Sequence, residues 1–346
     1  MHRISIISSC NDSLNNEIIY LMGIIHEYKG KEKLYRLTSK TIEVLNNNSI
    51  INSVIFSNKI EGIVTTKEMY KDIISDKAKL INRSEQEIAG YKDVLKIIMD
   101  NYKYMDISTN TILYLHKVLY SKTNISLGGK FKPTDNVIQE EDSDGNKIVR
   151  FKPVPAHLTK EYIDNLCSSF NEAISKNVDP LLAIPIFILD FLCIHPFNDG
   201  NGRISRLLII LLLYKFGYNI SKYISIEEEI DNNKELYYET LKQSSIDWHD
   251  TKNNYTYFIN YYLNIILSSY IELDMIASIN DDKTIDKIEN IISNSLIPIS
   301  KKEISKYLPD ISMITIERNL NKLLVDQKII KINSGKNTKY IINKDK

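Results

Sequence analysis

Cysteine, proline and glycine are all scarce in this chain of 346 residues. The three cysteines, Cys10, Cys167 and Cys193, are an odd number without a Cys-x-x-Cys pair, which argues against a disulfide framework and is typical of a reducing compartment. Only eight prolines and eleven glycines interrupt a sequence rich in isoleucine, leucine, asparagine and lysine. This composition favours a mainly α-helical globular protein of two or three domains.

Long hydrophobic runs are missing as well. The apolar run Leu207–Tyr214 is far shorter than the roughly 20 residues that a membrane helix needs. The first residues show neither the apolar core nor the cleavage site of a signal peptide. We therefore expect a cytoplasmic protein with no membrane partner; a homo-oligomer is compatible with the sequence.

The most informative segment is 195–206, which reads His-Pro-Phe-Asn-Asp-Gly-Asn-Gly-Arg-Ile-Ser-Arg. Gly200 and Gly202 let the backbone turn tightly and approach a ligand, and the apolar residues that follow predict a helix. The free N–H groups and the dipole at a helix N-terminus bind anions. Arg203 and Arg206 lie one turn apart, so both guanidinium groups suit a polyphosphate.

Two further residues of this segment predict a reaction. Asp199 precedes the glycines, where a carboxylate can hold Mg²⁺ that bridges phosphate oxygens. His195, as a neutral imidazole, can take a proton from an attacking hydroxyl. The segment thus predicts transfer of a phosphate ester onto an alcohol, and the alternative is a turn with a structural role only.

Segment 195–206 resembles the signature of the Fic family, His-x-Phe-x-(Asp/Glu)-Gly-Asn-Gly-Arg-x-x-Arg, at every defined position. Members of that family mostly move AMP from ATP to a Ser, Thr or Tyr hydroxyl of a target protein, and self-modification is a further expectation. The resemblance implies a role for each residue, with Phe197 anchoring the loop. These roles are His195 as base, Asp199 as Mg²⁺ ligand, Gly200, Asn201 and Gly202 as phosphate cradle, and Arg203 and Arg206 as holders of the outer phosphates.

Gly202 also bears on the type of reaction. The kinase-like Doc branch of the family tends to carry lysine at this position and binds the nucleotide the other way round. Glycine here favours nucleotidyl transfer over phosphoryl transfer.

A second motif, Ser57-Asn58-Lys59-Ile60-Glu61-Gly62, resembles the inhibitory (Ser/Thr)-x-x-x-Glu-(Gly/Asn) helix of one Fic class. Ser57 and Glu61 are four residues apart and point the same way on a helix, which Gly62 would end. The resemblance implies that Glu61 pairs with Arg206 and blocks the γ-phosphate position. In some relatives the same glutamate supports removal of AMP. The alternative is a helix end with a solvated Glu61.

Two weaker segments agree with this interpretation. Residues 131–151 predict two short extended runs around a turn at Asp144-Gly145, which resembles the flap that docks the target by strand pairing. Family members often have arginine where Lys132 stands, and a plain surface hairpin is the alternative. Tyr237 and Tyr238 resemble a family segment near the adenine ring, with core packing as the alternative. His116 and Cys193 are expected to be buried packing residues.

The spacing of apolar residues predicts a mainly helical chain as far as about residue 278. The resemblance implies its division into an N-terminal helical region over 1–90, with the inhibitory helix near 50–62, and a Fic catalytic core over 91–278. Thr65 and Glu68 resemble a capping box for a helix that ends near Ser75. The other expected helices are 12–28, 33–47, 50–61, 84–100, 108–121, 159–175, 181–194, 203–216, 233–245 and 255–278.

Residues 285–346 differ in charge from the rest of the chain. They contain 12 Lys and Arg against 7 Asp and Glu, a net charge of +5, whereas the remainder carries −5. Helices followed by two apolar strands, 329–332 and 340–342, resemble a small α+β winged helix-turn-helix. Side chains expected to face DNA are Thr315, Asn319, Lys322, Lys336 and Lys339. Protein contact or a structural role is the alternative.

Two functions of different class follow. The first is an autoinhibited protein adenylyltransferase that uses ATP and Mg²⁺. The second is a nucleotide-sensing, DNA-binding regulator with little turnover.

Overall fold

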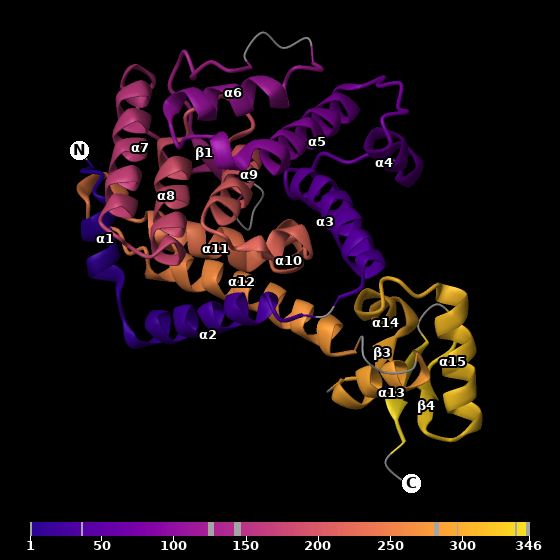
Figure 1. Cartoon of the computed structure of the whole chain (residues 1–346). Coiled ribbons are helices and arrows are strands. Elements are labelled where there is room, and N and C mark those ends of the chain that lie inside the picture. The colour runs from indigo at the N-terminus through magenta and orange to yellow at the C-terminus, as the bar shows by residue number, and fades with distance from the viewer. Residues whose placement is uncertain are drawn as a thin grey trace.

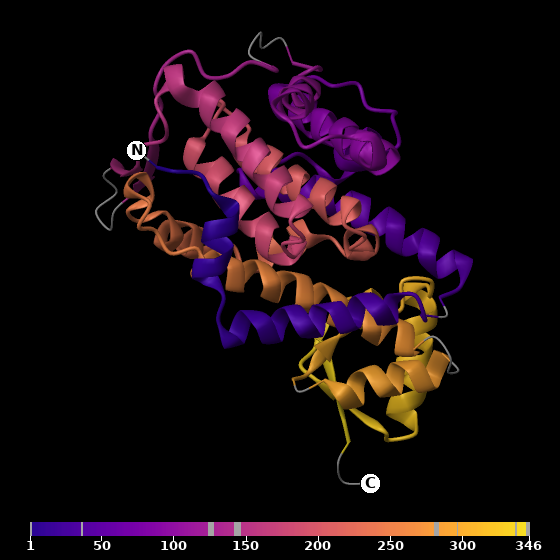
Figure 2. The same ribbon diagram turned by 60° about the vertical axis from the view of Figure 1, so that its left-hand side comes forward.

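A computed structural model describes residues 2–35, 37–123, 128–141, 147–279, 284–295, 297–335 and 338–343. The protein is mostly helical, as the sequence predicts. A large helical body holds one continuous hydrophobic core between Ile6 and Ile276, and a smaller unit holds a second core between Ile288 and Tyr340 (Figures 1 and 2). The part of the chain that the structure describes contains no helix long and apolar enough to span a membrane.

Helices make up most of the N-terminal part of the chain, up to Leu119. They are α1 (Ile6–Ser13), α2 (Asn16–Glu32), α3 (Ser39–Ile60), α4 (Lys67–Ile74), α5 (Arg83–Asn101) and α6 (Thr109–Leu119). The expected break between residues 47 and 50 is wrong. Leu45, Ser49 and Ser53 are all buried along one face of α3, so packing carries this helix through its asparagines. The cap of α4 is Thr66 rather than Thr65, because the Thr66 side chain accepts the Met69 N–H.

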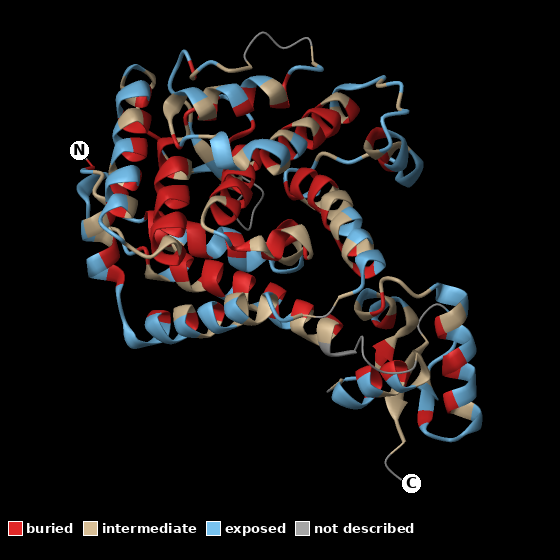
Figure 3. Cartoon of the chain, in the orientation of Figure 1, coloured by how far each residue is buried: buried red, intermediate tan, exposed pale blue. Residues whose placement is uncertain are grey.

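The remaining helices of the body are α7 (Thr159–Ser175), α8 (Pro180–Ile194), α9 (Asn201–Lys215), α10 (Ile226–Asn232), α11 (Lys234–Ser245) and α12 (Thr256–Ile279). Short 3₁₀ turns lie at Tyr102–Tyr104, Ala156–Leu158, Asn219–Lys222 and Trp248–Asp250. Helix α8 is apolar on nearly every face, and residues 207–213 of α9 are all apolar, so these two buried helices form the centre of the body (Figure 3). Helix α2 lies along α12 on the outside (Figure 2).

A two-stranded antiparallel hairpin, β1 (Ile138–Glu141) and β2 (Lys147–Phe151), precedes α7. Its register pairs Gln139 with Val149 and Glu141 with Lys147. The expected turn at Asp144-Gly145 lies outside the described residues.

The C-terminal unit has the element order expected of a winged helix-turn-helix. Its elements are α13 (Thr284–Asn294), β3 (Ile299–Ser300), α14 (Lys301–Tyr307), α15 (Met313–Val325), β4 (Ile329–Ile332) and β5 (Lys339–Ile342), and the strand order is β3-β5-β4. The expectation that Asn319 faces DNA is wrong: only 6% of its surface is exposed, and its side chain donates to the Thr315 carbonyl. Lys322 is exposed, and Lys336 lies outside the described residues.

Candidate active site

The loop 195–200 joins the two most deeply buried helices of the protein. Helix α8 ends at Ile194, and the next residue, His195, adopts a left-handed backbone conformation (φ +50°) while its N–H still bonds to the Phe191 carbonyl. Gly200, with φ +84°, precedes the first residue of α9. Since the first N–H groups of a helix lack acceptors within it, the loop presents an anion-binding helix end beside a histidine.

Aromatic stacking holds this loop in place. Phe197 is fully buried, and the His116 ring lies parallel to it with centroids 3.7 Å apart. The Gly129 N–H donates to Nδ1 of His116, so Nε2 carries the proton and donates to the Asp199 carbonyl at 3.1 Å. Burial lowers the pKa of His116 to about 4 and keeps the ring neutral. The predicted packing residue therefore also positions the loop.

The side chain of Asn201 closes the loop on itself. Its Oδ1 accepts the Phe197 N–H at 3.0 Å, and its Nδ2 donates to the Phe197 carbonyl at 2.7 Å. Asn201 is buried, and its side-chain amide is committed to the loop. Only its backbone N–H remains as a candidate group for the expected phosphate cradle.

Lys132 supports the same loop from the segment before the hairpin. Its backbone N–H donates to the Pro196 carbonyl, and its ammonium group donates to Asn136 and to the Ile194 carbonyl. Burial lowers the pKa of Lys132 to about 8. Lys132 therefore holds the C-terminal end of α8.

His195 lines a pocket, and its Nε2 forms no hydrogen bond with the residues that the structure describes. Its Nδ1 is 3.3 Å from the Leu192 carbonyl, which can only accept, so this contact places the proton on Nδ1. Burial lowers the pKa of His195 to about 4. At neutral pH the ring is uncharged, and Nε2 has a lone pair available to take a proton.

The carboxylate of Glu61 lies at the N-terminus of α9, in the same pocket. Oε1 of Glu61 is 2.8 Å from Nη2 of Arg206, and a Cβ built on Gly202 would lie only 2.1 Å from the same oxygen. Ser57 accepts from Arg206 twice, through its hydroxyl and its carbonyl, at 2.8 Å each. The structure thus brings together both residues of the second motif with two residues of the first.

Arg206 is buried with only 1% of its surface exposed, yet its Nη1 has no hydrogen-bond partner in the portion of the chain that is described. This nitrogen lies 3.3 Å from the position of a Cβ on Gly202. A buried cationic donor beside a helix N-terminus and a glycine without a side chain fits an anionic group.

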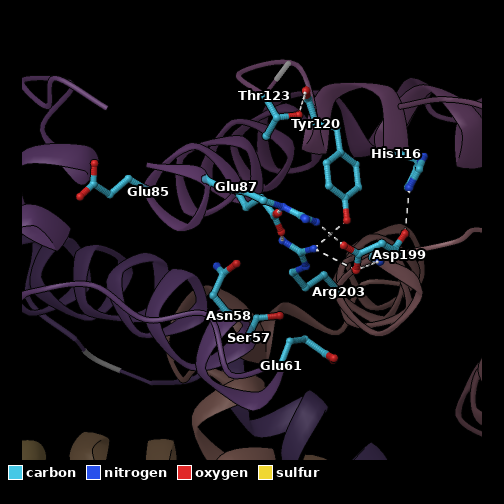
Figure 4. A network of polar contacts seen from close by, with 12 residues as sticks. Ser57, Asn58, Glu61, Glu85, Glu87, His116, Tyr120, Thr123, Asp199 and Arg203 are labelled. Atoms are coloured by element: carbon cyan, nitrogen blue, oxygen red, sulfur yellow. Dashed lines mark hydrogen bonds and ion pairs between the residues drawn. The ribbon is translucent and has the colours of Figure 1, made fainter. Parts of the chain in front are cut away.

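Arg203 and Asp199 are arranged differently from the expectation. Arg203 does not line the His195 pocket; it lies 2.6 Å from Glu87, donates to the Tyr120 hydroxyl at 2.8 Å, and lies 3.6 Å from Asp199 (Figure 4). Asp199 borders a second cavity with Lys132 and Arg83, whose Nη2 is 2.7 Å from Oδ2 of Asp199.

The wall of the His195 pocket includes the predicted tyrosines. Tyr237 is buried against Tyr261 and Phe258, whereas Tyr238 keeps 39% of its surface exposed. The Tyr237 side chain can therefore both pack in the core and contact a ligand in the pocket. Cys193 also borders the pocket, and burial raises the pKa of its thiol well above the usual value, which makes it a poor nucleophile.

Sequence reasoning missed Arg83, Glu87 and Tyr120. The four-residue spacing of Arg83 and Glu87 on α5 indicated an ion pair, which the structure contains. No local signal pointed from these residues to Asp199 or Arg203, more than 80 residues further along the chain.

Comparisons with known proteins agree with this fold. Residues 106–213 match the model of the Fic/DOC family. A protein adenylyltransferase fic-1 of Caenorhabditis elegans is 24% identical over 139 residues, which cover 39% of this chain and 25% of that protein. A protein adenylyltransferase Fic of Nematostella vectensis is 26% identical over 198 residues, which cover 55% of this chain and 42% of that protein.

A solved structure shows the same fold over nearly the whole chain. It is a Fic family protein from Desulfovibrio desulfuricans G20, with a TM-score of 0.62 and 21% identity over 96% of this chain and 97% of that one. Residues 106–213 therefore match the Fic/DOC family domain, and the chain shares its fold with a Fic family protein. The match spans less than half the length of the two curated relatives.

Proposed function

We propose that this protein transfers AMP from ATP to the hydroxyl group of a protein side chain. The observation that carries the proposal is the pocket itself, which holds a neutral histidine with a free Nε2 beside the N-terminus of α9 and the buried Arg206. A base and a polyphosphate site within one pocket suit attack of an alcohol on a nucleotide. The names of the curated relatives support the same reaction.

The polyphosphate of ATP would lie against the N-terminus of α9. The open backbone at Gly202 and the unpartnered Nη1 of Arg206 support this placement. Tyr237 and Tyr238 on α11 border the other part of the pocket and would contact the nucleoside. Arg203 would act from within its ion-pair network as a fixed positive charge.

Asp199 would supply the protein ligand for Mg²⁺. Its side chain is about half exposed at the loop, and Mg²⁺ is usually held by one or two carboxylates together with substrate phosphates. Such an ion would neutralise charge on the phosphates during transfer. Arg83 has to release Oδ2 of Asp199 before that oxygen coordinates a metal.

In the proposed reaction, the target hydroxyl oxygen forms a bond to the α-phosphorus of ATP. The bond from that phosphorus to the β-phosphate bridging oxygen breaks, and pyrophosphate leaves. Nε2 of His195 takes the hydroxyl proton. Backbone N–H groups at the N-terminus of α9 would stabilise charge on the phosphoryl oxygens. The Glu61 carboxylate has to move away from this N-terminus first.

The target would dock along the hairpin β1–β2. The sheet has only these two strands among the described residues. Ile148 and Val149 are exposed on β2, and Val137 is exposed just before β1. An extended peptide can add to such an edge through backbone hydrogen bonds. Ile138, Arg150 and Phe151 also border the His195 pocket, so a peptide held there would lie close to the base.

Label transfer from ATP tests the proposed reaction. With Mg²⁺, α-labelled ATP should label protein in the Glu61→Gly variant, whereas γ-labelled ATP and an EDTA control should not. Label from the γ-position alone would replace the proposal with phosphoryl transfer. Absence of label from either position, with cell lysate as target, would favour the nucleotide-sensing regulator.

The pH dependence of transfer reports on His195. Because only the neutral imidazole accepts a proton and burial lowers its pKa to about 4, the base stays active as the pH falls from 7 to 5. We expect kcat/KM of Glu61→Gly to stay nearly constant over this range and to fall only as the pH approaches 4. An acidic limb centred near 6.5 would contradict the assigned environment of His195.

A further inference from the structure

Helix α10, which the sequence did not predict, holds the helix that carries Glu61. The hydroxyl of Ser53 on α3 donates to Glu227 at 2.9 Å, and the ammonium group of Lys59 lies 2.6 Å from Asp231. Lys234, just after α10, donates to the Ile60 carbonyl at 2.8 Å. The position of the last turns of α3, and therefore of Glu61, depends on the position of α10.

One carboxylate of α10 joins α3 to the C-terminal unit. Oε2 of Glu228 accepts from the Asn52 amide of α3 at 2.6 Å, and Oε1 of the same side chain accepts from the Lys306 ammonium group of α14 at 2.9 Å. Figure 1 shows α14 at the side of the body where α3 begins. Glu228 is thus a direct polar link between the helix of Glu61 and the C-terminal unit.

Lys306 balances more than one negative charge. Glu229 on α10 and Glu272 on α12 lie close enough to Glu228 and to Lys306 to interact with both electrostatically. Burial raises the pKa of Glu272 to about 7, with Glu229 and Glu228 adding to the effect. Tyr307, next to Lys306, packs against both hydrophobic cores. If α14 moved away, three neighbouring carboxyl groups would lose this shared cation.

We propose that the C-terminal unit sets the strength of the Glu61–Arg206 contact through the Lys306–Glu228–Asn52 connection. With α14 in place, α10 is held against α3 and Glu61 stays on Arg206. Movement of α14 away from α10 leaves the carboxyl groups to repel one another, loosens α10 from α3 and frees Arg206 for the nucleotide. This inference rests on the inhibitory role of Glu61 in the proposed function.

ATP binding measured by calorimetry on the full chain tests the connection without catalysis. Lys306→Gln removes the charge from a side chain that is 45% exposed, so folding should be preserved. We expect ATP affinity to rise about fivefold, within the range typical of coupling through packed networks. The matched control is Lys328→Gln, which breaks an ion pair with Glu289 inside the C-terminal unit and should leave affinity unchanged.

Lys306→Gln in a Glu61→Gly background shows whether the effect on ATP affinity passes through Glu61. If Lys306 acts through Glu61, Lys306→Gln should have no further effect there. Hydrogen exchange supplies a second readout, since amides of residues 58–63 should exchange faster in Lys306→Gln and not in Lys328→Gln.

Three results would overturn the inference, and they separate it from the proposed function. Unchanged affinity in Lys306→Gln, with tighter binding in Glu61→Gly, would remove the connection and leave the inhibition intact. An equal effect of Lys306→Gln in both backgrounds would show a route that bypasses Glu61. Unchanged affinity in Glu61→Gly would remove the inhibitory role itself, and the connection with it.

Discussion

Replacing His195 with alanine is expected to reduce AMP transfer about 10²–10⁴-fold, the usual contribution of a positioned general base. ATP affinity should change little, because the nucleotide would be held mainly by the end of α9 and by Arg206. Transfer is best measured in single-turnover experiments in the Glu61→Gly background, where the polyphosphate site is free. Calorimetric titration of the same proteins with ATP provides the binding constant.

The backbone of His195 calls for a second variant. Its φ of +50° is uncommon for residues other than glycine, and asparagine tolerates this conformation better than alanine. His195→Asn should preserve the end of α8 and still lose transfer. His157→Ala, at an exposed histidine on a neighbouring 3₁₀ turn, is the matched control and should keep full activity. Substantial transfer by His195→Asn would exclude His195 as the base.

The parts of the site that the sequence predicted are those set by local spacing. His195, Gly202 and Arg206 fall within one loop and one helical turn, so their approach follows from the chain itself. Ser57 and Glu61 lie on the same face of α3 because they are four residues apart. The meeting of these two segments, about 150 residues apart, was predicted only through the family resemblance.

The parts that the sequence did not predict depend on tertiary packing. Arg203 is expected from the family resemblance to hold the outer phosphates, and the sequence gives no sign that Glu87 on α5 and Tyr120, the residue after α6, contact it and bury it. Asn319 has the polarity of a DNA contact, yet a bond to the carbonyl of Thr315 lets it be buried. Local patterns carry no information on which helix covers a given face.

Replacing Glu61 with glycine is expected to raise ATP affinity and AMP transfer about 10- to 100-fold, in the range of typical coupling energies. In the proposed function, nucleotide phosphate and the Glu61 carboxylate of the wild type would compete for Arg206 and for the space above Gly202. Glycine removes the competitor and fits the end of α3, where the chain already leaves the helix. Initial rates of label incorporation and calorimetric ATP titration measure both effects.

The free energy of unfolding of the Glu61→Gly variant should fall while its ATP affinity rises, and this combination makes the prediction specific. Without Glu61, buried Arg206 keeps its bonds to Ser57 and its contact with Tyr237 but loses its carboxylate partner, so the nucleotide-free variant should lose about 1 kcal/mol and melt about 2–4 °C lower. ATP should then raise its Tm more than that of the wild type, because tighter binding stabilises the folded state more. Glu61→Gln, which can still bond to Arg206 but lacks the charge, should fall between the two. A Glu61→Gly variant with wild-type ATP affinity would show that the ion pair is structural and that Arg206 does not hold the nucleotide.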